Sequence, residues 1–69
     1  MAQKPPTAET DRQIYFEFQT LGVQVRVAAI DSETGVEVII IAPKTASQIQ
    51  MQTIAKAKLE RRLAQLAQS

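Results

Sequence analysis

Few side chains of this 69-residue sequence could perform chemistry at neutral pH. The sequence contains neither histidine nor cysteine, which removes the usual general base, the thiolate nucleophile and the common zinc ligands. A carboxylate or a lysine with a strongly shifted pKa would have to replace them, and such a shift requires deep burial that a small fold can scarcely provide. We therefore expect a protein that is not an enzyme and that has no catalytic, cofactor-binding or metal-binding site.

Two short motifs bear a superficial likeness to known binding sites. The stretch "PKTA" (43–46) places Lys before Thr as the end of a P-loop does, but it lacks the upstream glycines that would cradle a phosphate. The stretch "DSE" (31–33) supplies two carboxylates in one turn, whereas an EF-hand loop needs more oxygen ligands at fixed spacing. We interpret the first motif as a helix start and the second as a solvent-exposed hairpin tip.

A third motif, "KAKLERR" (56–62), concentrates positive charge in the last part of the chain. Its basic side chains are a possible contact for nucleic-acid phosphates. The same charges also fit a solvated helix end, because the helix dipole favours cations there. Nucleic-acid binding is therefore the alternative function that the sequence offers, and its candidate residues are Lys56, Lys58, Arg61 and Arg62.

The net charge of +1 hides two oppositely charged halves. Residues 1–43 carry three basic and six acidic side chains, whereas residues 44–69 carry five basic and one acidic side chain. The net charges of the halves are thus −3 and +4. This asymmetry can reflect a basic helix end that complements its own dipole, or it can favour head-to-tail contacts between copies.

The elements that must position these residues can be read from hydrophobic periodicity. Residues 1–13 are polar, contain two prolines and show no period, which predicts a disordered arm. Apolar and polar side chains then alternate over 14–19 and 23–28, and a β-branched run covers about 36–42, as three strands require. Residues 14–69 are therefore predicted to form one α+β domain, a three-stranded antiparallel meander followed by one long C-terminal helix (β-β-β-α).

Both strand connections can be drawn as four-residue loops that end in glycine. The loop "QTLG" (19–22) would pair Phe18 with Val23, and the loop "SETG" (32–35) would pair Asp31 with Val36. Glycine suits the last position because the backbone there usually turns left-handed, and Asp31 can accept hydrogen bonds from its turn. The predicted core face of the sheet carries Ile14, Phe16, Phe18, Val23, Val25, Val27, Ala29, Val38 and Ile40.

A long helix is predicted after Pro43. The stretch "TASQ" (45–48) fits a capping box with Thr45 as the cap, and nothing from residue 46 to residue 68 breaks a helix. Its predicted packing stripe consists of Met51, Ala55, Leu59, Leu63 and Leu66.

This arrangement leaves apolar side chains that a single helix does not cover. On the sheet face opposite the core, the predicted register forms the rows Tyr15–Arg26–Ile41 and Gln13–Ala28–Ile39. A helix of about 35 Å should also extend past strands of about 25 Å. We therefore expect a homodimer, formed either by the two sheet faces or by the edges of the third strands. The predicted self-association residues are Ile39, Ile41, Tyr15, Ala28, Leu63 and Leu66.

Four stretches resemble a known family. They are "YFEF" (15–18), "AIDSETGVEV" (29–38), "APKTAS" (42–47) and "AKAKLERRL" (55–63). Together they are similar to a family of short bacterial proteins that carries a domain of unknown function. The resemblance implies a stand-alone protein and supplies no catalytic or binding residues.

The remaining expectations concern the compartment and the partners. The chain has no apolar run near the ~18 residues that span a bilayer, and its first residues lack the apolar centre of a signal peptide. We expect a soluble, cytoplasmic protein. Its predicted function is that of a small self-associating interaction module with an unidentified protein partner and no cofactor.

Overall fold

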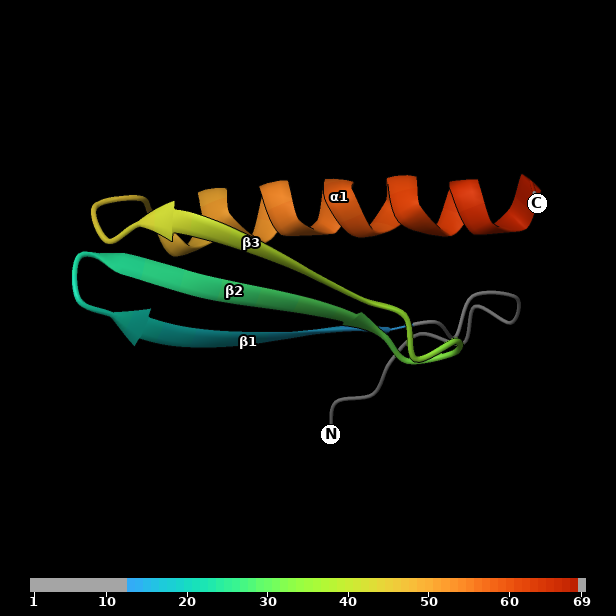
Figure 1. The fold of residues 1–69 in the computed structure, drawn as a ribbon, viewed down its shortest axis with the longest axis horizontal. Coiled ribbons are helices and arrows are strands. Elements are labelled where there is room, and N and C mark those ends of the chain that lie inside the picture. Colours follow the sequence, from blue (N-terminus) through green and yellow to red (C-terminus); the bar gives the residue numbers. More distant parts are fainter. Residues whose placement is uncertain (1–12, 69) are drawn as a thin grey trace, which may run out of the picture.

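A computed structural model describes residues 13–68 of the chain as three strands and one helix (Figure 1). The strands β1 (Ile14–Leu21), β2 (Gln24–Asp31) and β3 (Glu37–Pro43) form one antiparallel sheet in the order β1-β2-β3. The helix α1 (Gln48–Gln68) follows. The predicted α+β fold of β-β-β-α order is confirmed. Of the predicted arm, residues 1–12 lie outside the described residues.

The hairpin between β2 and β3 has the predicted register. The Asp31 backbone N–H donates to the Val36 carbonyl at 2.9 Å, and the Gly35 N–H donates to the Asp31 carbonyl at 2.8 Å. Gly35 has a φ of 78°, which only glycine adopts without steric cost. The Asp31 carboxylate accepts hydrogen bonds from the Thr34 N–H at 3.0 Å and from the Thr34 hydroxyl at 2.6 Å. Turn chemistry thus fixes β3 against β2.

The hairpin between β1 and β2 differs from the prediction. Its connection is the two-residue turn Gly22–Val23 with Leu21 opposite Gln24, so Phe18 faces Val27 instead of Val23. Gly22 has a φ of 64° and stands first in the turn, which is typical of a type II′ turn. The register is shifted by an even number of residues, so each side chain keeps its predicted face although its neighbours change.

The helix begins two residues later than predicted. Ser47, and not Thr45, is its cap: the Gln50 N–H donates to the Ser47 hydroxyl at 3.0 Å, and the Ser47 N–H donates to Gln50 Oε1 at 3.2 Å. This reciprocal pair is a capping box. Before it, the Ala46 N–H donates to the Pro43 carbonyl at 2.9 Å. The chain uses that turn to leave β3, which delays the start of α1.

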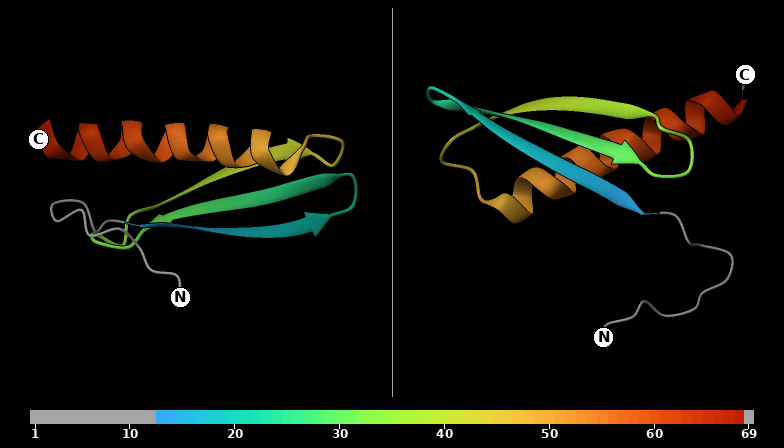
Figure 2. Two further views of the ribbon diagram at one scale, coloured as in Figure 1. Left: turned by 180° about the vertical axis from the view of Figure 1, so that it is seen from behind. Right: turned by 90° about the horizontal axis from the view of Figure 1, so that it is seen from below.

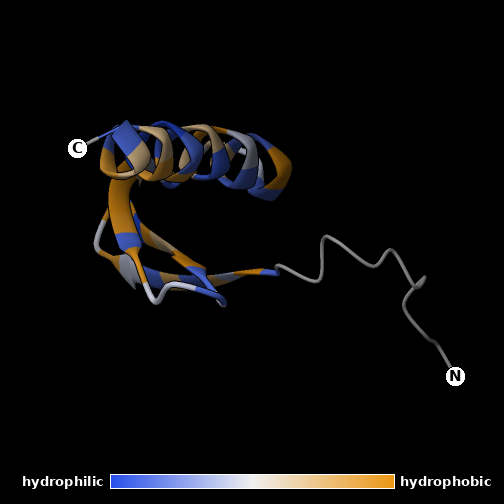
Figure 3. Ribbon diagram, turned by 90° about the vertical axis from the view of Figure 1, so that its right-hand side faces the viewer, coloured by the Kyte–Doolittle hydropathy of each residue, from blue (hydrophilic) through white to orange (hydrophobic). Residues whose placement is uncertain are grey.

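The core lies between α1 and the sheet face that contacts it, which we call the inner face. Met51, Ala55 and Leu59 are buried, which confirms the centre of the predicted helix stripe. They pack on buried side chains of β2 and β3, namely Val25, Val27, Ala29, Val38 and Ala42. Seen from the side, β3 lies next to α1 and β1 lies farther away (Figure 3).

Two predicted core residues are exposed, and three others, Ile14, Phe16 and Ile40, are only half-buried against the core. Phe18 is 37% exposed and Val23 is 79% exposed. Phe18 stands on β1, and α1 packs on β2 and β3. Val23 belongs to the first turn and not to a strand. The core is therefore smaller than the alternation pattern predicts.

Candidate functional site

The sheet face opposite α1, which we call the outer face, has no helix or strand packed on it in the described part of the chain. Figure 2 (right) looks onto the strands from this side, with α1 behind them. Its side chains form four cross-strand rows. In the order β1–β2–β3 they are Tyr15–Ile30–Glu37, Glu17–Ala28–Ile39, Gln19–Arg26–Ile41 and Leu21–Gln24–Pro43.

Apolar side chains occupy much of the outer face. Tyr15 and Ile41 are each 54% exposed and Leu21 is 47% exposed, while Ile30 and Ile39 are half-buried. Ala28 is fully buried because its short side chain lies below those of its neighbours. The structure thus brings four predicted self-association residues onto one face, although Tyr15 lies beside Ile30 and not beside Arg26.

Three charged side chains share this face. Arg26 is half-buried between Gln19 and Ile41, and Glu17 and Glu37 are exposed. Within residues 13–68, the Arg26 guanidinium forms no ion pair or hydrogen bond. The aliphatic part of the Arg26 side chain is therefore packed, while the N–H groups of its guanidinium can donate hydrogen bonds to a partner.

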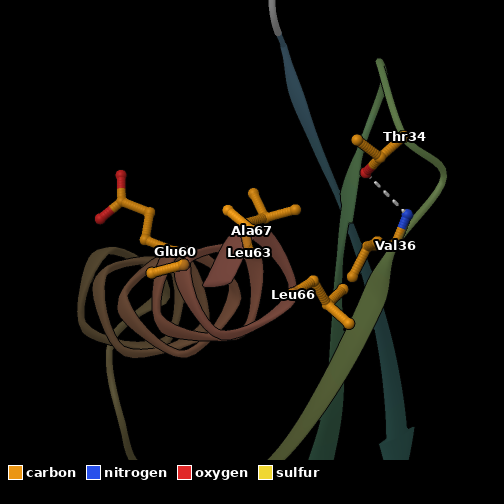
Figure 4. A pocket seen from close by; sticks show the side chains of 7 residues that line it. Thr34, Val36, Glu60, Leu63, Leu66 and Ala67 are labelled. Atoms are coloured by element: carbon orange, nitrogen blue, oxygen red, sulfur yellow. Dashed lines mark hydrogen bonds between the residues drawn. The ribbon is translucent and has the colours of Figure 1, made fainter. Parts of the chain in front are cut away.

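The two predicted leucines of the helix end lie elsewhere. Leu63 is half-buried and packs against the core, as does Val36, which directly precedes β3. Leu66 is 42% exposed and lines an open hollow of about 590 Å³ with Thr34, Val36 and Glu60 (Figure 4). The last turns of α1 extend past the β2–β3 hairpin (Figure 1). Neither leucine is on the outer face, so the six predicted residues form two separate surfaces.

Three of the four basic candidate residues of α1 share one side of the helix. Successive residues are turned by about 100°, so Lys58, Arg61 and Arg62 fall within about 100° of one another, whereas Lys56 points about 160° away from Lys58. Lys58 and Arg61 line one shallow hollow together with Ile40 and Ile54. Three of the candidate nucleic-acid residues are therefore grouped, and Lys56 is separate from them.

Lys58 also covers the free edge of β3. Its ammonium group donates a hydrogen bond to the Ile39 carbonyl at 2.7 Å. In the antiparallel ladder the backbone groups of Glu37, Ile39 and Ile41 point away from β2, and Pro43 has no N–H to offer. Pairing of two β3 edges, one of the two predicted dimer geometries, would have to displace Lys58.

Residues 13–68 contain no group of three or more acidic, histidine or cysteine side chains placed to hold a metal ion. Within the same range, α1 lacks the apolar length that a bilayer-crossing helix requires.

Comparison with known proteins gives one match. A family model described as "Domain of unknown function (DUF6898)" matches residues 11–66. Neither the curated proteins nor the solved structures contain a match to the chain. The matched range covers all three strands and nearly all of α1.

Proposed function

We propose that this chain, which belongs to the family described as "Domain of unknown function (DUF6898)", is a non-catalytic, cytoplasmic interaction module that self-associates through its outer face. The observation that supports this proposal is the set of exposed apolar side chains on that face, above all Tyr15 and Ile41. Ile30 and Ile39 lie between these two residues in the register, and apolar side chains gathered on one face mark interaction sites.

The size of the chain supports the same proposal. A domain of this length buries only about 60% of the surface that its unfolded chain exposes, and self-association is a common way to add core. Each apolar Å² removed from water contributes about 25 cal/mol. A second copy seated on the outer face would bury Tyr15, Leu21, Ile39 and Ile41. The outer faces of the two copies would then form an additional hydrophobic core. An unidentified protein partner would bind the surfaces that remain exposed.

The test is the molar mass in solution of the wild type and of Ile41→Lys. We expect the wild type to approach twice 7.6 kDa as its concentration rises in sedimentation equilibrium. Ile41→Lys should stay near 7.6 kDa, because a lysine there would have to lose its hydration in the interface.

The matched control is Ile49→Lys, which makes the same change at a side chain that is 75% exposed on α1. This variant should associate like the wild type. A wild type that is monomeric at every concentration would contradict the proposal, and so would an Ile41→Lys variant that associates as strongly as the wild type.

Nucleic-acid binding remains the alternative proposal. The observation in its favour is that Lys58 and Arg61 line the same hollow. Titration of labelled duplex and single strands at two salt concentrations tests it, because binding that neutralises phosphates must weaken steeply with salt. Binding that Lys56→Ala and Arg62→Ala both leave unchanged would restrict the contact to Lys58 and Arg61. No binding at low salt would remove the alternative.

A further inference from the structure

We infer that the outer face pairs with the outer face of a second copy in one specific arrangement, in which Arg26 of each copy contacts Glu17 of the other. This inference rests on the proposed self-association and adds its geometry. Its basis is that the outer face carries both members of the ion pair: a half-buried arginine that has no ionic partner among residues 13–68, and an exposed glutamate one row away.

Arg26 is half-buried on the outer face. Its head group forms no ion pair within residues 13–68, although its stem is held between Gln19 and Ile41. Less conformational entropy is lost when a partner binds a side chain that is already held. A guanidinium offers five donors in a planar fork that matches a carboxylate. Arg26 is therefore prepared to bind an acidic group that approaches the outer face.

The order of charges along the strands selects the arrangement of the two copies. Two stacked sheets keep their strands roughly aligned, so a two-fold axis between them runs either along the strands or across them. An axis along β2 would place Arg26 over Arg26 of the second copy, which like charges disfavour. An axis across the strands reverses the order of the rows and separates these two arginines.

The position of this axis along the strands decides which rows of the two copies meet. When the axis passes between the Arg26 and Ala28 rows, Arg26 lies over Ala28 of the second copy, beside its Glu17. The Ala28 side chain is a single methyl group, so Arg26 meets the smallest side chain of that row. The same axis places Ile41 over Ile39 of the second copy. Every charge on the face then meets either an opposite charge or an uncharged row.

A second copy also suits the outer face better than pairing at the β3 edge. The Lys58 ammonium occupies the Ile39 carbonyl at that edge, and charged lysines at sheet edges oppose strand addition. The outer face has no such obstacle among the described residues. When two outer faces stack, the hydrogen bond from Lys58 to the Ile39 carbonyl stays intact.

A charge swap tests the arrangement. Arg26→Glu and Glu17→Arg should each weaken the dimer about tenfold or more, because each puts two like charges together twice in the interface. An equimolar mixture of the two variants should restore the dimer, since each then supplies the charge that the other lacks. Sedimentation equilibrium of the separate and mixed variants measures this. The milder variant Arg26→Gln should also weaken the dimer, and circular dichroism checks that each variant is folded.

The control is Glu37→Arg, which makes the same charge change on the same face but lies over Pro43 of the second copy in this arrangement. It should leave the dimer unchanged. A wild type that never dimerises would overturn the proposed function and this inference together. A wild-type dimer that neither Arg26→Glu nor Glu17→Arg weakens, or variants that fail to dimerise when mixed, would overturn the inference alone.

Discussion

At the scale of single residues, the start of α1 depends on Ser47. Its hydroxyl accepts the Gln50 N–H, one of the four amides that a helix start leaves without an intrahelical partner. Gln50 returns the interaction by accepting the Ser47 N–H. Thr45, two residues earlier, is exposed and lies in the turn that leaves β3. Ser47 therefore stabilises the start of α1, and Thr45 takes no part in that cap.

We predict that Ser47→Ala lowers the free energy of unfolding by about 1 kcal/mol, the usual value of a lost helix cap. Thr45→Ala is the matched control and should change this free energy by less than half as much. Urea denaturation followed by circular dichroism measures both. An equal loss in the two variants would mean that Ser47 is not the cap.

At the scale of the elements, Lys58 joins α1 to the edge of β3. The hydrogen bond to the Ile39 carbonyl is 2.7 Å long and satisfies an acceptor that points away from the sheet. An exposed edge with free acceptors and β-branched side chains is a template for further strands. We therefore expect the charged Lys58 side chain to oppose the addition of further strands at this edge.

We predict that Lys58→Ala forms species larger than a dimer at high concentration, because the β3 edge then becomes available. Static light scattering over time measures this. Lys56→Ala removes the same charge from another side of the helix and is the matched control. Equal aggregation of the two variants would attribute the effect to lost net charge and not to the edge.

The two hairpins of the sheet show how far a turn can be predicted from sequence. In the structure, Gly35 ends a four-residue loop and Gly22 begins a two-residue turn. In the sequence, both are isolated glycines between two apolar strands, so the two turn types look alike. The sequence predicted the second loop correctly and the first one incorrectly. Alternation still assigned the faces, because the shift was even. The neighbours across β1 and β2 depended on the turn type, so the position of Tyr15 beside Ile30 instead of Arg26 could not be foreseen.

At the scale of the whole molecule, one helix is too narrow for three strands. A helix is about 10 Å wide, whereas strands lie about 4.8 Å apart, so α1 covers two strands well. It packs on β2 and β3, and Phe18 on β1 stays 37% exposed. Fold order and the apolar outer face followed from the sequence. The limited reach of the core did not, because hydrophobic alternation carries no information on which strands a helix covers.

In the proposed dimer, the outer face of one copy meets the outer face of another. An isotope-filtered NOE experiment on an equal mixture of labelled and unlabelled protein tests this contact most directly. We expect contacts between the methyl groups of Ile41 in one copy and those of Ile39 in the other. Intermolecular contacts confined to Phe18 and Ile14 on β1, or none at concentrations where the protein is dimeric, would contradict it.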